Sequence, residues 1–509
     1  MTFLAGLLFL LVATVIGCAM LPARTVLARS AAEEAALSYL LGAAAVVVGL
    51  TAGLAAGIRF DLLFFLPLLT AAGCAFVLWR RGPGGALAPW ELGRPAAVVL
   101  GLLALGSVAA TLALPLNEFD PIYHFAFRGR VLLHDGIANG ESIVGMIQAD
   151  GYGRLVTHPN YPFGVPILEA WTATIGGWDD RWVQLPLAFW TACLPMAVAF
   201  GLRDRGSSAA RTGALVAAVT PMLYGADYLM RGFVDLPRAG LAGEMMLGGG
   251  GDLAVATFMT LGFALWLRVR ATASWHGIAL AALAFAAAAM MKNEGLALGG
   301  CVVLALLLGE LLPRFRAEFP RLLAPFRLAA LLILMVLPWV LLRAQLPAID
   351  ENYTERLTPA NVAHFWTADE LVDRSPQAQA GKTDDSGPVE KRRAVVVAAF
   401  LEEFMDWRSW GLLWLLFLFS LPVTRARLAD PRLKQLCLLV LGATLLYFLI
   451  LLVTPWNFPS LRDKGIPERL LVHLTGVMAL AVGSALGIGR ADGPDSATAT
   501  EQAATEVAA

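Results

Sequence analysis

The chain has 509 residues, a formal net charge of −1, 58% hydrophobic residues and a mean hydropathy of +0.68. A charge this close to zero gives no overall field that would attract nucleic acid, so we expect no nucleic-acid partner. The apolar residues lie in long runs and not in amphipathic stripes. This pattern excludes an ordinary soluble domain and indicates a protein of the lipid bilayer.

A helix needs about 20 apolar residues to cross the hydrocarbon core of a membrane. On that criterion we predict an all-α polytopic protein of about thirteen spans, with boundaries good to a few residues. The predicted spans are residues 3–22, 34–57, 61–79, 95–116, 182–202, 210–228, 252–268, 276–291, 295–313, 327–344, 409–424, 435–453 and 467–489. The first run lacks a basic leading segment, which favours a retained helix over a signal peptide.

If these spans alternate in direction, the basic loops share one side, and the positive-inside rule makes that side cytoplasmic. The basic residues are Arg24, Arg29, Arg80, Arg81, Arg94, Arg203, Arg205, Arg268, Arg270 and those within 314–327 and 425–434. We therefore expect a multi-pass protein of the plasma (inner) membrane with its N-terminus outside. The polar tail 490–509 is typical of a disordered segment and falls on the cytoplasmic side.

Two loops, 117–181 and 344–408, are too long to be simple connectors, and both fall on the outer side. In the first, residues 121–133 carry apolar side chains at helical spacing, which predicts a helix lying along the membrane interface. Two prolines then break the chain around Tyr161, before a short apolar helix near 163–176. The second loop has a middle of low apolar content, 375–391, between segments that could pack.

Ionisable residues at the outer ends of the spans form a functional hypothesis, because an uncompensated charge at membrane depth is costly. They occur in four stretches that are far apart in sequence: Glu118 and Asp120, then Asp235, then Lys292 and Glu294, then Arg469 and His473. The last two are one helical turn apart and so share a face.

Each stretch also has a simpler interpretation. Asp120 and Asp235 could cap helices. Lys292 and Glu294 could be a solvated turn pair of little energy. Arg469 could anchor its helix at the lipid headgroups. Their joint placement on one membrane face favours a common site.

In order, the chain reads Asp-Pro-Ile-Tyr-His from Asp120, Asn-Tyr-Pro from Asn160, Gly-Phe-Val-Asp-Leu-Pro from Gly232, Lys-Asn-Glu-Gly from Lys292 and Glu-Arg-Leu-Leu-Val-His-Leu from Glu468. This series resembles the GT-C superfamily of integral-membrane glycosyltransferases. The closest branch is the bacterial one akin to protein O-mannosyltransferases and lipid A aminoarabinose transferases. The resemblance covers 95–489, a catalytic membrane domain, which leaves 1–94 as additional N-terminal helices and 490–509 as the tail.

The resemblance implies an inverting glycosyltransferase. It would move a hexosyl or pentosyl group from a polyprenyl-phosphate-linked donor to a lipid, glycan or protein acceptor on the periplasmic or extracellular face. The family position of the catalytic carboxylate matches Asp120, with Glu118 as the alternative. A carboxylate suits this chemistry because the acceptor hydroxyl needs a positioned base as the anomeric centre becomes oxocarbenium-like.

A lipid-phosphate leaving group requires fixed cations, which Lys292, Arg469 and either Arg231 or Arg128 can supply. Other polar residues of the same motifs would orient the sugar or these cations: His124, Tyr161, Asp235, Glu294 and His473. We expect no cofactor and no metal. The alternative is a divalent ion among Asp120, His124, His158 and Asp235, although no spacing among them requires one.

Two rival functions stay open. The first is a transporter or flippase for a lipid-linked sugar, for which the run Gly248 to Asp252 is the best candidate for an unwound helix. The second is a glycan ligase or polymerase, which could use the same large outer loop and arginines. A deep cavity at the outer face that opens sideways to lipid favours a transferase, and a through-going or midplane cavity favours transport.

Overall fold

The computed structural model describes residues 1–81, 85–90, 92–113, 120–134, 160–224, 251–270, 274–311, 319–344, 346, 356–367, 371–373, 389–423, 430–454 and 466–486. Within these ranges almost every ordered segment is helical. The exception is a small antiparallel pair of strands, β1 (Leu371–Asp373) and β2 (Val389–Lys391), in which Leu371 pairs with Lys391. The all-α expectation therefore holds for the bundle, and the second long loop adds one short hairpin-like pairing.

The α-helices, in chain order, are α1 (Thr2–Met20), α2 (Ala31–Ala55), α3 (Phe60–Leu63), α4 (Phe65–Arg81), α5 (Gly93–Ala113), α6 (Phe127–His134), α8 (Gly164–Gly176), α9 (Leu185–Ala188), α10 (Trp190–Leu202), α11 (Ser207–Ala218), α14 (Gly251–Val269), α15 (Trp275–Met291), α16 (Asn293–Leu311), α17 (Phe319–Arg343), α19 (Pro359–Thr367), α20 (Arg392–Met405), α21 (Trp407–Trp410), α22 (Leu413–Val423), α23 (Pro431–Val453), α24 (Ile466–Val472) and α25 (Thr475–Leu486). The other described helical segments are the π-helix η1 (Asp120–Ala126) and the short 3₁₀-helices η2 (Trp182–Gln184), η3 (Arg203–Arg205) and η4 (Pro221–Tyr224).

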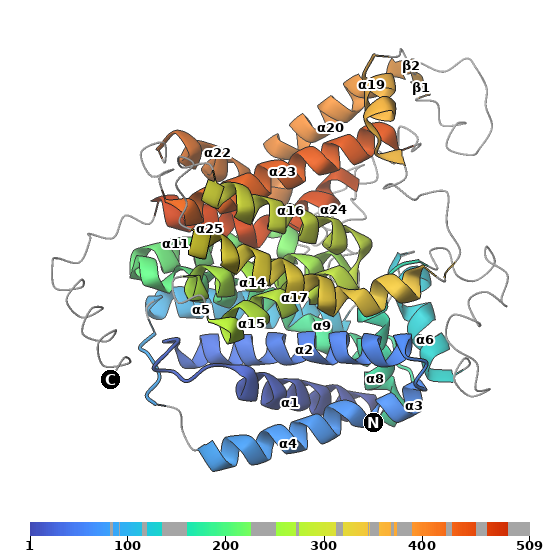
Figure 1. Cartoon of the computed structure of the whole chain (residues 1–509), viewed down its shortest axis with the longest axis vertical. Helices are drawn as coiled ribbons and strands as arrows, with labels where there is room; N and C mark the ends of the chain where they lie inside the picture. The colour runs from blue at the N-terminus through green and yellow to red at the C-terminus, as the bar shows by residue number, and fades with distance from the viewer. Residues whose placement is uncertain are drawn as a thin grey trace.

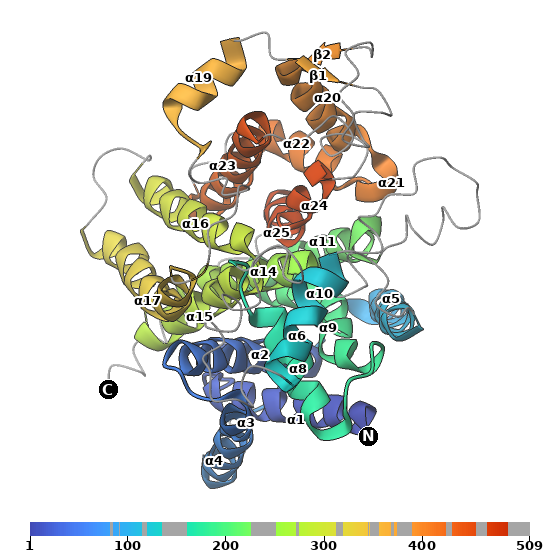
Figure 2. The same ribbon diagram turned by 90° about the vertical axis from the view of Figure 1, so that its right-hand side faces the viewer.

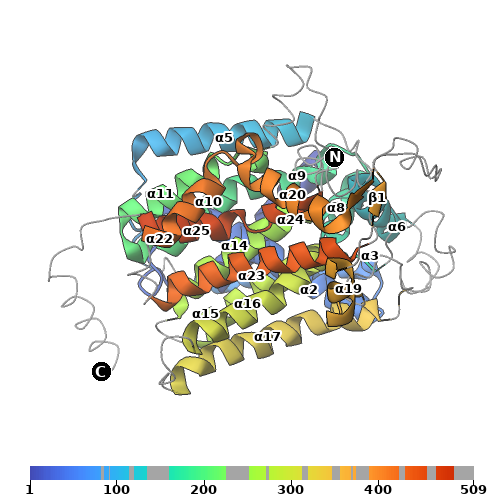
Figure 3. The ribbon, with the colours of Figure 1, turned by 90° about the horizontal axis from the view of Figure 1, so that it is seen from above.

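The long helices run side by side along one direction, as Figures 1 and 3 show from two perpendicular views, and Figure 2 looks down their axes. Nine described helices are long and apolar enough to cross a membrane, or ten if the bent pair α24–α25 counts as one span. The protein is thus a multi-pass membrane protein. The count of thirteen is not confirmed, because three predicted spans form shorter helices: α11 with 12 residues, α15 with 17 and α22 with 11.

Helix α14 forms the centre of the bundle. The apolar segment of α14 that could span the membrane is 100% buried. The corresponding segments of the spans that contain α4 and α5 are each only 22% buried. Figure 2 accordingly shows α14 in the middle and α4 and α5 at the edges. A polar side chain on α14 therefore has no contact with lipid or water, and it must find its partners within the protein.

One end of the bundle is held by ion pairs between the basic loops. Arg203 contacts Glu33 at 2.7 Å, Arg268 contacts Asp204 at 2.5 Å, and Arg205 pairs with Asp430. These contacts join the segment that follows α10 to the first turn of α2, to the last turn of α14 and to the N-cap of α23. These basic segments therefore meet at one end of the bundle. The Lys292 turn lies at the other end, because Lys292 contacts the first turn of α14 whereas Arg268 is in its last turn.

The first long loop contains the two helices that its sequence predicts. Residues 121–133 form η1 and α6, and residues 164–176 form α8. Helix α6 packs closely on α8, because the position of a Cβ on Gly129 would be only 3.2 Å from the backbone oxygen of Pro166. Helix α8 also packs against α1, where the rings of Phe9 and Trp171 are 5.3 Å apart.

Glu169 of α8 is a buried carboxylate outside the membrane-spanning helices. Its side chain is 0% exposed, and neither oxygen has a hydrogen-bond partner among the described residues. Burial raises the pKa of Glu169 well above its usual value, and the nearby Asp180 carboxylate raises it further. The folded protein therefore holds this side chain in its neutral form.

Because the pKa of Glu169 is higher in the folded than in the unfolded chain, its stability contribution is fully present below about pH 4, near the unfolded pKa. That contribution is lost as the pH rises through the folded pKa. Replacing Glu169 with Gln removes the titration, so Glu169→Gln should raise the thermal midpoint in detergent by a few degrees at pH 8 and change it little at pH 5. Equal midpoints for Glu169→Gln and the parent across this pH range would contradict the assignment.

Candidate functional site

The carboxylate of Asp252, in the first turn of α14, is the centre of a buried charge cluster. Its Oδ1 accepts hydrogen bonds from Lys292 Nζ at 2.6 Å and His473 Nε2 at 2.9 Å. Its Oδ2 accepts one from Arg469 Nε at 3.1 Å. We refer to Asp252, Lys292, Arg469, His473 and Tyr447 as the Asp252 cluster. It joins residues more than 200 positions apart in the sequence.

Lys292 reaches Asp252 because α15 and α16 meet at a one-residue turn. Helix α15 ends at Met291, Lys292 is extended (φ −156°, ψ 153°), and α16 begins at Asn293. Gly295 makes this reversal possible, since a Cβ there would collide with the backbone oxygen of Ala288. The two helices therefore fold directly back on each other, and the Lys292 side chain is directed into the bundle.

A second glycine brings Asp252 up to the lysine. A Cβ on Gly251 would lie 3.1 Å from the backbone oxygen of Met291, 3.5 Å from Lys292 Cβ and 3.2 Å from Phe125 Cζ. Only a residue without a side chain fits comfortably between these groups. Gly251 therefore sets the spacing between α14 and the Lys292 turn, and it places η1 directly against the cluster.

Arg469 and His473 come from a bent span. Helix α24 ends at Val472, α25 begins at Thr475, and the two helices are bent by 54°. His473 lies at the bend, and its Nδ1 shares a hydrogen bond with Tyr447 Oη of α23 at 2.8 Å. A continuous hydrogen-bonded chain therefore runs from Tyr447 through His473 to Asp252, and it orients the imidazole ring toward the carboxylate.

Burial within the cluster is deep, and it is graded. The side chains of Asp252 and His473 are 0% exposed and that of Lys292 is 3%, whereas those of Arg469 and Glu294 are 12% and 13%. Glu294 contacts Lys292 at 3.4 Å. A buried carboxylate is stable only when it is paired and hydrogen-bonded, and Asp252 has three such partners. Arg469 and Glu294 are the charged side chains of this group that are least buried.

The first loop reaches this cluster through Phe125, whose Cζ lies 3.2 Å from the Cβ position of Gly251 and whose ring centroid is 6.3 Å from that of Tyr161. His124 and Tyr161 are both buried, with ring centroids 5.5 Å apart. Arg128 is 1% exposed, its guanidinium lies 3.8 Å from the centroid of the Phe163 ring, and its Nη1 donates to Pro162 O at 3.3 Å. Burial lowers the pKa of Arg128 to about 9, and its Nε and Nη2 have no partner among the described residues.

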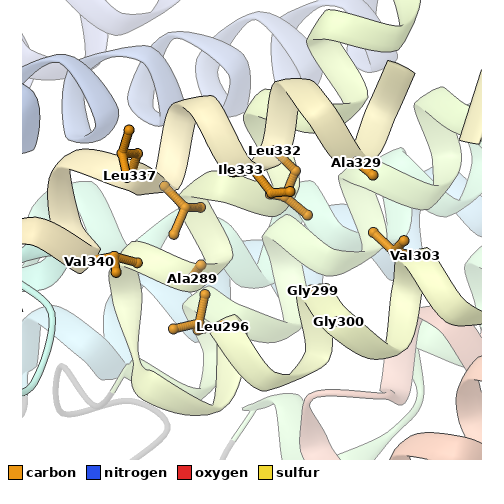
Figure 4. A pocket seen from close by; sticks show the side chains of 11 residues that line it. Ala289, Leu296, Gly299, Gly300, Val303, Ala329, Leu332, Ile333, Leu337 and Val340 are labelled. Atoms are coloured by element: carbon orange, nitrogen blue, oxygen red, sulfur yellow. The ribbon is translucent and has the colours of Figure 1, made fainter. Parts of the chain in front are cut away.

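An apolar groove of about 450 Å³ begins beside the Lys292 turn. Its walls are Ala289 of α15, residues 296–303 of α16 and residues 329–340 of α17, as Figure 4 shows. Every lining residue is apolar. The groove opens sideways from the bundle, since Ile333 and Leu337 along it are 67% and 42% exposed.

The structure brings together four of the residues that the sequence singled out: Lys292, Glu294, Arg469 and His473. His124 and Tyr161 adjoin each other, and Phe125 lies between Tyr161 and the Gly251 position next to Asp252. Asp120 is the first residue of η1, the element that contains His124, but the side chain of Asp120 is not among those described. Glu118, Arg231, Asp235 and His158 lie outside the described residues.

Asp252 and Tyr447 were missed by the sequence analysis. The interpretation of Gly251 and Asp252 as part of an unwound helix is wrong, because both residues lie inside α14. A carboxylate in the first turn of an otherwise apolar span was a usable signal, by the same argument that singled out Lys292. Tyr447 gave none, since a tyrosine inside an apolar span has no distinctive pattern.

Three carboxylates form a separate group, which includes Glu468, the residue before Arg469. Oxygens of Glu403, Asp406 and Glu468 lie within 4.8 Å of one another. Protein donors already occupy two of them: Trp410 Nε1 donates to Glu403 at 3.2 Å, and Ser409 Oγ donates to Asp406 at 2.8 Å. Asp406 also caps α21, so its position has a structural explanation.

Fold and site together define a multi-pass membrane protein with a buried charge cluster at one end of its bundle. No protein-family model and no curated protein matches the chain. Among solved structures, the chain is similar to the archaeal oligosaccharyltransferase AglB from Archaeoglobus fulgidus, in complex with an inhibitory peptide and a dolichol-phosphate. The identity is 13% and the TM-score is 0.43. The likeness covers 79% of this chain and 51% of that one, so this chain spans about half the length of that structure.

A double-mutant cycle tests the pairing at the centre of the cluster. Asp252→Asn and Lys292→Gln should each lower the thermal midpoint, because each leaves a buried charge without its partner. The double variant should lose less than the sum of the two, with a coupling on the order of 1–3 kcal/mol. The exposed pair Arg59 and Asp61, treated in the same way, should show additive effects. Additive losses at Asp252 and Lys292 would mean that the two groups do not form an ion pair in the folded protein.

Proposed function

We propose that this protein is a membrane glycosyltransferase. It takes a sugar from a polyprenyl-phosphate-linked donor and transfers it to an acceptor at the membrane end that carries the Asp252 cluster. The observation that carries the proposal is the adjacency of two features: a fixed pair of cations, Lys292 and Arg469, and a lipid-facing apolar groove that begins three residues before Lys292. A phosphate joined to a hydrocarbon chain matches both.

The cations are preorganised for an anion. Lys292 donates to Asp252 and lies near Glu294, and an ammonium group carries three donors, so one donor stays available for a ligand. Arg469 contacts Asp252 through Nε, and it is the more exposed of the two cations. Because Asp252 holds both cations in place before a ligand arrives, little reorganisation is needed as the departing phosphate gains charge.

The base in this proposal is Asp120, with Glu118 as the alternative. Asp120 opens η1, and Phe125 of the same element contacts the Gly251 position beside Asp252. A carboxylate on this element would approach the acceptor hydroxyl from the first loop while the phosphate is held by the cluster. His124, Tyr161 and, by the resemblance, Asp235 would orient the sugar. The reaction inverts the anomeric centre, and it proceeds outside the cytoplasm at the plasma (inner) membrane.

A transporter or flippase is the rival function, and the described cavity favours the transferase. The groove occupies the part of α16 and α17 nearest the Lys292 turn, and it opens sideways. A transporter would instead place its site near the midplane between repeated halves. The glycan ligase or polymerase alternative would share the cation pair and would differ in the acceptor.

Substitution of the two cations tests donor binding. Lys292→Ala and Arg469→Ala should each weaken both binding and turnover of a purified polyprenyl-phosphate sugar, since the phosphate contact is present in the ground state and strengthens in the transition state. Arg469→Lys should lose more than Lys292→Arg, because a guanidinium can contact two phosphate oxygens and an ammonium acts as a compact point charge. Arg59→Ala, at an exposed pair, is the matched control. Unchanged binding and turnover in both alanine variants would return these residues to a role as headgroup anchors.

Substitution of the carboxylates in the first loop tests the base. Asp120→Asn keeps the size of the side chain and removes its basicity, so transfer should fall by roughly 100-fold or more while donor binding is retained. Glu118→Gln should have a smaller effect. If Asp120→Asn transfers normally and Glu118→Gln does not, the base is Glu118. Loss of donor binding in Asp120→Asn would indicate a structural effect in place of a catalytic one.

A further inference from the structure

Arg128 of α6 is a buried cation whose hydrogen-bonding capacity is only partly used. Its side chain is 1% exposed, its Nη1 donates to Pro162 O at 3.3 Å, and its guanidinium lies 3.8 Å from the centroid of the Phe163 ring. Its Nε and Nη2 have no hydrogen-bond partner among the described residues. Burial lowers the pKa of Arg128 to about 9, and no described carboxylate offsets this effect. A buried charge with two open donors is costly, so its retention points to a ligand.

The two open donors, Nε and Nη2, lie on one edge of the guanidinium and form a fork. Elsewhere in this chain the same edge binds carboxylates. Arg24 donates through Nε and Nη2 to the two oxygens of Glu34, each at 2.8 Å. Arg59 donates through the same two atoms to the two oxygens of Asp61, at 3.1 and 2.9 Å. In Arg128 the stacked ring and the bond from Nη1 fix the plane of the group, so this edge is preset for an oxyanion.

The segment that holds Arg128 packs against the residues that precede Lys292. The ring stacked on the guanidinium is followed by Gly164, where a Cβ would collide with the backbone oxygen of Met290. Lys292 is two residues further along the chain. Arg128 therefore lies at the same end of the molecule as the Asp252 cluster, and its positive charge is separate from the two that Asp252 already holds.

The charge and the neighbours of Arg128 indicate the kind of oxyanion. One buried positive charge matches the single charge of a carboxylate, whereas a phosphate monoester carries about −1.5 to −2 at pH 7 and costs more to bury. His124 is four residues before Arg128, and Tyr161 is two residues before Phe163. Both are residues that the proposed reaction uses to orient the sugar. A carboxylate at Arg128 would therefore belong to a sugar.

We propose that Arg128 binds the carboxylate of an acidic sugar, so that the donor sugar or the acceptor glycan of this enzyme is a uronic acid. The inference rests on the proposed function, because it takes a sugar to lie between the first loop and the Asp252 cluster. Nε and Nη2 each donate to one carboxylate oxygen, and the ligand neutralises the buried charge. Since Arg128 is 1% exposed, its neighbours must shift to admit the sugar.

The test compares D-glucuronate with its neutral counterpart D-glucose, by ligand-observed NMR titration of the purified protein in nanodiscs. The parent should bind glucuronate more tightly by at least about tenfold, the usual worth of hydrogen bonds to a charged group. Arg128→Lys keeps the charge and loses the fork, so it should lose most of this preference. The control is Arg130→Lys on the same helix, where the arginine is exposed and already contacts Asp180 at 2.7 Å. It should bind both sugars as the parent does.

Arg128→Met separates a binding role from a structural one. An unpaired buried charge that is kept for a ligand lowers the stability of the empty protein. Arg128→Met should therefore raise the thermal midpoint without ligand and abolish the preference for glucuronate. A lower midpoint with the preference retained would mean that Arg128 only stabilises the first loop, and it would overturn the inference.

Undecaprenyl phosphate that carries either glucuronate or glucose identifies the source of the carboxylate. Tighter binding of the glucuronate form, lost in Arg128→Lys, assigns the carboxylate to the donor sugar. Equal binding of the two forms, with free glucuronate still preferred, assigns it to the acceptor. If Arg128→Lys weakens only undecaprenyl diphosphate, the edge binds a second phosphate and the inference is wrong.

Two outcomes separate this inference from the proposed function. A parent that binds undecaprenyl phosphate through Lys292 and Arg469, and prefers glucuronate in no form, would overturn the inference and leave the proposed function intact. An Arg128-dependent preference for glucuronate in a protein that binds no polyprenyl phosphate would overturn the proposed function instead.

Discussion

The burial of the Asp252 carboxylate at the centre of the bundle constrains everything around it. An ionised carboxylate in such a place is tolerated only with close cationic and hydrogen-bonding partners. Three side chains from two other parts of the chain meet that requirement: Lys292, Arg469 and His473. The requirement therefore ties α14 to the α15–α16 turn and to the bent α24–α25 span at one end of the molecule. It also explains why two cations stay fixed in a largely apolar environment.

Close helix contacts make this arrangement possible. Gly251 and Gly295 let backbones approach where a side chain would intervene, so Asp252 and Lys292 come within hydrogen-bonding distance. Ala289 and Leu296, which lie on either side of the Lys292 turn in the sequence, line the apolar groove. The polar and apolar features thus lie close together, and the proposal that an anionic lipid binds here rests on their combination.

The sequence singled out the cations of the Asp252 cluster but not the carboxylate that they contact. Lys292 and Arg469 were recognisable because each is a charge at the end of an apolar run, where charges are costly. Asp252 follows four glycines, which directed attention to backbone flexibility and away from its carboxylate. The predicted number of spans is not confirmed, because α15 and α22 are apolar but shorter than the other candidate spans in the described part of the chain. The two strands at 371–373 and 389–391 had no usable pattern, since each is only three residues long. Which side chain of the first loop meets the cluster depends on packing contacts that no local pattern encodes.

The most direct test of the central claim is an experimental structure of the protein in nanodiscs with a bound polyprenyl-phosphate sugar. The claim predicts phosphate oxygens within about 3 Å of Lys292 Nζ and of the Arg469 guanidinium, the usual length of a charge-assisted hydrogen bond. It also predicts that the Asp252 carboxylate keeps its contacts to both cations. A phosphate bound elsewhere, with the Asp252 cluster unchanged and unoccupied, or a ligand at the midplane between two halves of the bundle, would contradict it.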